Sequence, residues 1–232
     1  MATPSPDAPR TRRASDWAGF IGHLGVVAVS VIRTPALTLF VLPSYVHMLL
    51  AAGSFLIRDQ PRRLEQNVWA RIVAYAGGFG VFAFVQCASA FKPEWLVVTS
   101  NPGVGLAGIA LALIGTFLEI WAVCHLRFAF STEPAARRLV TSGPYRLARH
   151  PIYSGACLVY LGLLLTHPTM AVVMALLAWG MCIRFRMRYE ETILTQAFPE
   201  YEEYRRRVGA LVPWTRLMSA DRSANVVPAT EV

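Results

Sequence analysis

The chain has 232 residues, of which 55% are hydrophobic and 16% are charged, and its mean hydropathy is +0.43. Soluble domains carry about 25% charged residues, so this composition excludes an ordinary soluble domain and indicates a membrane protein. The net charge of +8 comes almost wholly from arginine, since Lys92 is the only lysine. The arginines lie in loops beside apolar runs, which fits lipid headgroups and membrane topology rather than a nucleic-acid partner.

Apolar runs taken in chain order predict a set of transmembrane helices over residues 17–126. A membrane-spanning helix takes about 20 residues. The runs 34–57, 69–91 and 103–126 are long enough, whereas 17–32 is short for a span. We expect 17–32 to be the first of six spans. An interfacial helix before five spans is the alternative, and a signal peptide is a third possibility.

The second half of the chain predicts a helical hairpin followed by a surface helix. Two short apolar runs, 152–165 and 169–183, are separated by Thr166-His167-Pro168. Beyond them Tyr201, Tyr204 and Val208 recur on one helical face, with Pro199 expected in the first turn. This pattern indicates an amphipathic cytoplasmic helix lying at the membrane surface.

The domain boundaries follow from these runs. Residues 1–16 are rich in Pro, Ala and Arg and are expected to be disordered. The core with the hairpin covers residues 127–213, and residues 214–232 form a flexible tail. The predicted fold is therefore an all-α, polytopic membrane bundle of five to six transmembrane helices with a C-terminal amphipathic helix.

Arginine placement predicts the orientation of this bundle. Arginines crowd the segments 58–71, 127–151 and the stretch after residue 183, whereas the 92–102 segment carries only Lys92. The positive-inside rule therefore places the three arginine-rich segments in the cytoplasm. We expect a multi-pass protein of the cell inner membrane with its site on the cytoplasmic face.

Residues 143–155 carry the densest group of candidate site residues. Pro151 suits a helix's first turn, so His150 would cap a helix whose free N–H groups favour an anion. Arg146 and Arg149 add forked donors for a carboxylate or phosphate. Tyr153 lies on the same face as His150, and Gly155 leaves room for a ligand or a neighbouring helix. A basic anchor holding lipid phosphates is the alternative interpretation.

A second polar cluster, Glu190-Glu191, follows the hairpin and three arginines at positions 184, 186 and 188. It is either a local salt-bridge network or a place where one carboxylate turns inward, to bind ribose hydroxyls or a cationic ligand. The hairpin would return residues 184–191 to the neighbourhood of 146–155. Acid and base from two sequence regions would then line one pocket.

Other polar residues lie within the apolar runs. Glu119 is a functional candidate because a carboxylate in a span is costly, although a structural partner such as an arginine would also explain it. We interpret His23, His47 and His167 as structural. The four cysteines form no CxxC pair, so neither a metal site nor a disulfide framework is expected.

Several linked motifs around the hairpin resemble the isoprenylcysteine carboxyl methyltransferase family over residues 126–213. They read Gly143-Pro144-Tyr145-Arg146, Arg149-His150-Pro151-x-Tyr153-x-Gly155, Glu190-Glu191-x-x-Leu194 and Phe198-x-x-Tyr201-x-x-Tyr204. The resemblance implies S-adenosylmethionine as methyl donor, bound at the cytoplasmic face. It implies a cofactor pocket lined by Tyr145, Arg146, Arg149, His150, Tyr153, Gly155, Glu190 and Glu191, with Arg149 and Glu190 as the catalytic pair.

The resulting hypothesis is an integral-membrane methyltransferase that acts on a lipophilic acceptor. That acceptor would be an isoprenylcysteine carboxylate, a small or lipidic thiol, or an amine headgroup, and the lipid bilayer would be the protein's other partner. Two alternatives remain open at this point. One is a sterol-reductase-like oxidoreductase that uses NADPH, and the other is a non-enzymatic lipid-binding membrane protein.

Overall fold

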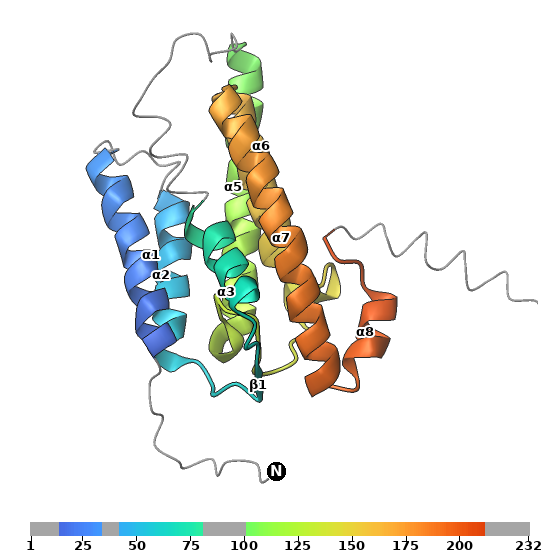
Figure 1. Cartoon of the computed structure of the whole chain (residues 1–232). Coiled ribbons are helices and arrows are strands. Elements are labelled where there is room, and N and C mark those ends of the chain that lie inside the picture. Colours follow the sequence, from blue (N-terminus) through green and yellow to red (C-terminus); the bar gives the residue numbers. More distant parts are fainter. Residues whose placement is uncertain (1–13, 34–41, 81–100, 212–232) are drawn as a thin grey trace, which may run out of the picture.

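A computed structural model of the chain describes residues 14–33, 42–80 and 101–211, which are largely helical (Figure 1). This confirms the predicted all-α class. The long helices are α1 (Ala14–Arg33), α2 (Leu42–Ile57), α3 (Val68–Tyr75), α5 (Pro102–Leu126), α6 (Pro151–Thr166) and α7 (Met170–Ala197), and α8 (Tyr201–Arg207) is short. The minor elements are β1 (Arg63–Leu64), the π-helical turn η1 (Ala76–Gly80), β2 (Ala135–Ala136) and the 3₁₀ turns η3 (Arg127–Ala129) and η4 (Gly143–Arg146).

Within the described ranges, one helix is long and apolar enough to cross a membrane, and it runs over Pro102–Ala129. Three shorter apolar helices cover Asp16–Ile32, Pro43–Ile57 and Pro151–Thr166. Parts of two expected spans, 34–41 and 81–91, lie outside the described residues. The number of five to six spans therefore stays a prediction.

Both ends of the chain, residues 1–16 and 214–232, were predicted to lack structure, and of these only residues 14–16 are described. α1 begins at Ala14. Residues 14–16 are therefore helical, and the prediction that they are disordered is wrong. Asp16 in its first turn forms an ion pair with Arg58. Residues 1–13 and the tail from 212 onward lie outside the described residues.

Helices α5 and α6 pack against each other at two pairs of glycines. A Cβ atom added at Gly155 would lie 2.6 Å from the Gly115 carbonyl oxygen, and one at Gly108 would lie 2.7 Å from the Gly162 carbonyl oxygen. The pairs are seven residues apart on each helix and run in opposite directions, so the helices are antiparallel. Small residues permit such close backbone approach between membrane helices.

Helix α7 continues well past the end of the apolar run that predicted it. Thr169 caps its start, where the Thr169 hydroxyl accepts the Val172 N–H at 3.3 Å. The helix then runs to Ala197, because residues after 183 are mostly strong helix formers. The hairpin is thus unequal, and the longer arm carries Glu190 and Glu191 beyond the apolar segment.

The predicted C-terminal helix is present as α8, but its apolar face is buried in the protein. Tyr201 and Tyr204 are 1% and 6% exposed and form a cluster with Ile193, Phe198 and Ala136. The expectation that this face lies on the membrane surface is therefore wrong, because α7 and β2 already cover it. Pro199 precedes α8 instead of occupying its first turn.

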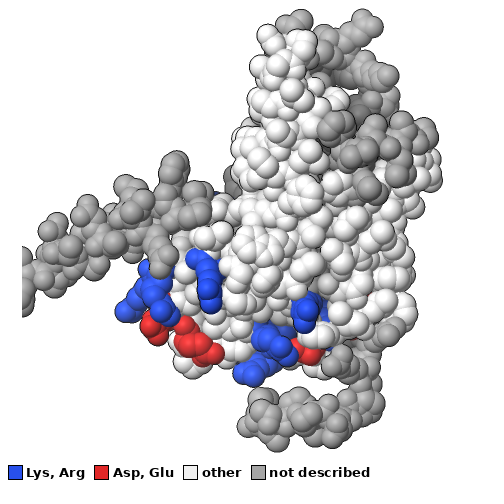
Figure 2. Space-filling model, turned by 180° about the vertical axis from the view of Figure 1, so that it is seen from behind, with Lys and Arg blue, Asp and Glu red and all other residues white. Residues whose placement is uncertain are grey.

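The arginine-rich segments meet at one end of the molecule, as the orientation argument requires. β1 pairs antiparallel with β2, joining Arg63 to Ala136 and Leu64 to Ala135. The Asp59 N–H also donates to the Phe128 carbonyl at 2.8 Å. Figure 2 shows the charged side chains gathered at one end of the visible face, while the rest of the described surface on that face is uncharged.

Candidate active site

A cavity of about 490 Å³ opens among the helices and joins two chemically different regions. Its polar end lies at the charged end of the molecule, and its deeper part is largely apolar. Polar-end residues include Tyr145, Arg149, His150, Tyr153, Arg186, Glu190, Tyr201 and Tyr204, and the deep part includes Met48, Val159, Leu163, Trp179 and Ile183.

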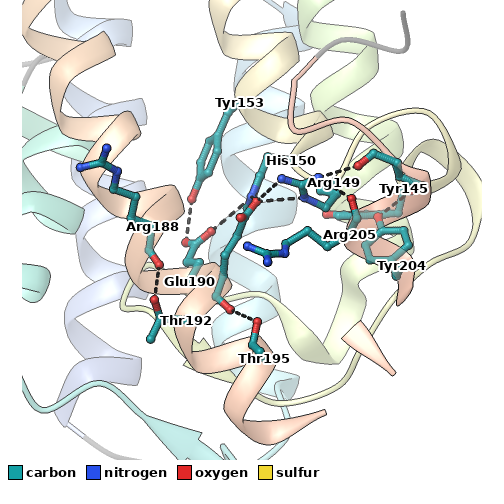
Figure 3. Close-up of polar contacts among 12 residues, drawn as sticks. Tyr145, Arg149, His150, Tyr153, Arg188, Glu190, Thr192, Thr195, Tyr204 and Arg205 are labelled. Atoms are coloured by element: carbon teal, nitrogen blue, oxygen red, sulfur yellow. Dashed lines mark hydrogen bonds and ion pairs between the residues drawn. The ribbon is translucent and has the colours of Figure 1, made fainter. Parts of the chain in front are cut away.

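Glu190 faces this cavity from α7 and is held by two donors, of which Figure 3 shows Tyr153. The Tyr153 hydroxyl donates to Glu190 Oε1 at 2.7 Å, and Arg186 Nε donates to the same oxygen at 2.9 Å. The other oxygen, Oε2, lies 3.6 Å from His150 Nδ1. One carboxylate oxygen is therefore fixed by the protein, and the second borders the cavity with an imidazole beside it.

Glu191, the next residue, binds a different set of partners. Its Oε1 accepts from Arg149 Nε at 2.9 Å, from Arg149 Nη2 at 2.8 Å and from His150 Nε2 at 3.0 Å. Partial burial acts to raise the pKa of Glu191, but the hydrogen bonds and charges of His150 and Arg149 outweigh it and lower that pKa to about 2. Glu191 is thus a permanent anion at neutral pH.

Arg149 and Glu191 also fasten the chain after α8 to the start of α6. Arg149 Nη1 donates to the carbonyls of Val208 at 2.5 Å and Arg205 at 3.1 Å. The backbone N–H groups of Arg149 and His150 donate to the carbonyls of Gly209 and Ala210, and the Ser154 hydroxyl donates to that of Leu211. We call this assembly of Arg149, Glu191 and residues 208–211 the C-terminal clamp.

His150 occupies the N-cap of α6 with Pro151 following it, as the sequence predicted. Its ring stacks on Tyr153 with centroids 5.4 Å apart, and it lies between the two carboxylates. The expected anion site at the helix start is altered by the clamp, because chain carbonyls already accept the N–H groups of residues 149 and 150.

Tyr145 and Tyr204 close the polar end. The Tyr204 hydroxyl donates to the Tyr145 carbonyl at 2.6 Å, which joins η4 to α8. Burial raises the pKa of both phenols, that of Tyr204 to about 12, so both stay protonated at neutral pH. Gly143 allows this turn, because its φ is +59° and a side chain there would collide with the His125 ring.

The structure brings together six of the eight predicted site residues: Tyr145, Arg149, His150, Tyr153, Glu190 and Glu191. Arg146 is exposed and does not border the cavity. Gly155 packs against Gly115 and the Glu119 side chain, so it makes room for a helix rather than for a ligand on the cavity wall. The assignment of individual roles remains a prediction.

Three residues of the cavity's polar end were missing from the predicted site: Arg186, Tyr201 and Tyr204. Arg186 is buried, donates to the Ser131 carbonyl at 3.1 Å and lies over the Tyr153 ring. Its i, i+4 spacing from Glu190 is the signal that could have identified it. The two tyrosines were visible in the motifs but were interpreted as a membrane-facing stripe.

The deep part of the cavity contains one polar pair. His47 Nδ1 on α2 lies 3.4 Å from Glu119 Oε2 on α5, and both residues border the cavity. The partner of Glu119 is thus a histidine and not the arginine that we considered. Within the residues that the structure describes, no group of three or more His, Cys, Asp or Glu side chains could hold a metal ion.

Comparison with known proteins agrees with this architecture. The phospholipid methyltransferase family matches residues 104–201, the stretch from α5 to the start of α8. The nickel-cobalt-cadmium resistance protein NccN of Alcaligenes xylosoxydans xylosoxydans is 32% identical over 67% of this chain and 67% of its own length. The cobalt-zinc-cadmium resistance protein CzcN of Cupriavidus metallidurans is 36% identical over 47% of this chain and 48% of its own length.

A plant relative carries the name of an enzyme. The probable protein-S-isoprenylcysteine O-methyltransferase of Oryza sativa subsp. indica is 33% identical over 48% of this chain and 62% of its own length. The chain thus spans between about half and two thirds of these relatives. These matches, together with the apolar helix α5, identify the class of protein as a membrane methyltransferase. The chain belongs to the isoprenylcysteine carboxyl methyltransferase family.

Proposed function

We propose that this protein is a multi-pass enzyme that moves the methyl group of S-adenosylmethionine to a lipophilic acceptor at the cytoplasmic face of the inner membrane. The observation that carries the proposal is the joining of two regions in one cavity. A polar end built by Tyr153, His150 and Glu190 opens directly into an apolar depth. A polar cofactor and a lipid-like acceptor can therefore meet inside it.

The residues of the polar end fit the chemistry of this cofactor. The cavity of about 490 Å³ lies within the usual range of roughly 300–1,000 Å³ for small-molecule sites. The Oε2 oxygen of Glu190, which among the described residues has only His150 Nδ1 beside it at 3.6 Å, suits a ribose hydroxyl or the amino group of the methionine part. The aromatic face of Tyr145 suits a sulfonium, and such cation–π contacts contribute about 0.5–2 kcal/mol.

The protein's part in the reaction is to position the cofactor and the acceptor and to exclude water. The bound cofactor supplies an electrophilic methyl group, and transfer requires an acceptor placed in line with it. Arg186 and Tyr153 hold one oxygen of Glu190, so the carboxylate presents the other oxygen without rearranging. The clamp keeps His150 and the start of α6 in place, which makes Arg149 a positioning residue in this proposal.

The family supports a methyl acceptor but leaves its chemistry open. The plant relatives are named for an isoprenylcysteine acceptor, and the matched family is described by phospholipids. Both names describe lipophilic molecules, which agrees with the apolar depth of the cavity. The names NccN and CzcN describe metal resistance, and a lipid or thiol modified at the inner membrane is compatible with that setting.

Calorimetry on the detergent-purified full chain tests the cofactor. We expect S-adenosylmethionine to bind and NADPH not to bind, and we expect label from the methyl group to enter an organic phase only when a lipophilic acceptor is added. Binding of NADPH without S-adenosylmethionine would support the reductase alternative and overturn the proposal. Binding of neither cofactor would support the non-enzymatic alternative.

A further inference from the structure

The apolar depth of the cavity contains a carboxyl group beside an imidazole. Glu119 Oε2 lies 3.4 Å from His47 Nδ1, and their side chains are only 11% and 10% exposed. The surrounding walls are formed by apolar residues such as Met48, Val159 and Leu163. An ionisable pair in such surroundings is costly to maintain and commonly serves a function.

The α5–α6 packing determines where this pair lies relative to the polar end. A Cβ atom at Gly155 would lie 2.6 Å from Glu119 Cγ, so Glu119 sits at the level of Gly155 on α6. Gly155 follows His150 by five residues, which is about 7.5 Å along a helix. Glu119 therefore borders the space just beyond the polar end, where the reacting atom of an acceptor would meet the donated methyl group.

We propose that Glu119, held by His47, is the base that removes a proton from the acceptor, and that the acceptor is a lipophilic thiol. This inference rests on the proposed function and narrows it to one substrate class. The thiol S–H would point at the Glu119 carboxylate, and its alkyl chain would lie along the apolar walls of the cavity.

The step balances without a further reactant. The Glu119 carboxylate takes the proton of the S–H group, and a sulfur lone pair forms a bond to the sulfonium-bound methyl carbon. The old bond between that carbon and the sulfonium breaks, and its electron pair stays on the cofactor sulfur. A cation and an anion become two neutral groups, which a cavity of low polarity favours because separated charges are costly there.

A carboxylate acceptor fits this arrangement poorly. It needs no base, because it is already a nucleophile. Its negative charge would keep Glu119 protonated, because two like charges repel strongly in such surroundings, so the Glu119–His47 pair would have no part in that reaction. The Glu119–His47 pair therefore favours a thiol over a carboxylate as the acceptor.

Other titratable groups surround the pair, and they enter the interpretation of any pH profile. Within the described residues these are His23 on α1 and the Tyr160 phenol on α6, both bordering the cavity. Arg186 and Glu190 lie toward the polar end and are paired with each other at 2.9 Å.

The test compares three acceptors of equal chain length, dodecanethiol, dodecylamine and dodecanoate, with methyl-labelled S-adenosylmethionine and the purified full chain. We expect the wild type to methylate the thiol at least tenfold faster than the other two. Glu119→Gln should lower kcat for the thiol about 100-fold at pH 7, within the usual range of a general base. His47→Gln should lower it about tenfold.

The pH profile separates a base from a structural residue. In Glu119→Gln the remaining rate should rise about tenfold per pH unit below the thiol pKa, since only thiolate formed in solution can react. The wild-type profile should stop rising at a lower pH than that of the variant, once Glu119 is fully deprotonated. A Glu119→Gln profile parallel to that of the wild type would overturn the proposal, and so would faster methylation of the carboxylate or the amine by the wild type.

Thr116→Val is the matched control. Thr116 is buried on the same helix, donates to the Ala112 carbonyl at 2.9 Å and does not border the cavity. The rate of thiol methylation by Thr116→Val should therefore stay within twofold of wild type. Glu119→Asp, which keeps the carboxyl group, serves if Glu119→Gln fails to fold. Calorimetry with S-adenosylmethionine separates the two levels: intact binding without thiol methylation rejects this inference alone, whereas absent binding by the wild type rejects the proposed function.

Discussion

Glu190 and Glu191 are neighbours on α7, but they belong to two regions with different tasks. Glu191 forms charged hydrogen bonds with Arg149 and His150 at the C-terminal clamp. Glu190 uses one oxygen on Tyr153 and Arg186 and leaves the other toward the cavity. One turn of helix therefore supplies both a fastening and a ligand-facing surface, and a pair of adjacent acids in a motif need not share one role.

The largest effect is expected on the cavity side. Glu190→Gln removes the charge that we propose for ribose or amino-group binding while keeping an acceptor for Tyr153. Since a hydrogen bond to a charged group contributes about 1.5–3 kcal/mol, the affinity for S-adenosylmethionine should fall about 10- to 100-fold. Isothermal calorimetry measures it. An unchanged Kd would remove Glu190 from the cofactor site.

A smaller loss of affinity for S-adenosylmethionine is expected when only a hydrogen bond that holds Glu190 is removed. Tyr153→Phe deletes the hydroxyl that donates to Glu190 at 2.7 Å and keeps the ring that stacks on His150. A hydrogen bond to a charged group contributes about 1.5–3 kcal/mol, but Arg186 still holds the same oxygen, so the affinity should fall only about fivefold. A loss as large as that of Glu190→Gln would mean that the phenol itself contacts the cofactor.

The clamp side should respond in stability more than in binding. Glu191→Gln leaves the Arg149 guanidinium without its anion, which should lower the free energy of unfolding by about 1–3 kcal/mol, while cofactor affinity changes less than threefold. Thermal unfolding and calorimetry on the same sample measure both quantities. The reverse pattern, a stable protein that no longer binds the cofactor, would show that Glu191 acts in binding like Glu190 and not in stability.

Low pH should weaken the ion pair between Glu191 and Arg149. The pKa of Glu191 is lowered from 4.5 to about 2 in the folded protein, so its contribution to stability is complete above pH 4.5 and is lost as pH falls toward 2. The Tm difference between wild type and Glu191→Gln should therefore shrink over this window. A difference that stays constant down to pH 2 would show that the ion pair is not its source.

Arg146 should give the smallest effect of all. It was predicted to bind the cofactor, but it is exposed and does not border the cavity. Arg146→Ala should therefore leave the Kd for S-adenosylmethionine within twofold of wild type. A loss beyond fivefold would restore the role that the motif indicated.

Local sequence rules were sufficient for much of this structure. Apolar length predicted α5, and Pro151 with its neighbours predicted the start of α6 and the N-cap position of His150. The unequal hairpin also brought the two polar clusters together as expected, because both of its ends lie on one side of an apolar segment. These features depend on short stretches of chain and on the properties of single residues.

The remaining features depend on which surfaces meet, and periodicity does not encode that. Tyr201 and Tyr204 have the spacing of a membrane-facing stripe, but β2 and α7 cover them. His47 gives no sign of its partner Glu119, since the two lie on separate helices joined only by the packing of the bundle. Gly155 was compatible with either a ligand or a helix, and only the α5–α6 contact distinguishes them.

The clamp has a consequence for the order in which a newly made molecule becomes functional. The Ser154 hydroxyl is satisfied by a carbonyl 57 residues later in the chain, and the Tyr145 carbonyl by a phenol 59 residues later. At about 5–20 residues per second on the ribosome, the start of α6 waits several seconds for these partners. The polar end of the cavity is therefore completed late in synthesis, so a half-made chain would lack the site that we propose for S-adenosylmethionine.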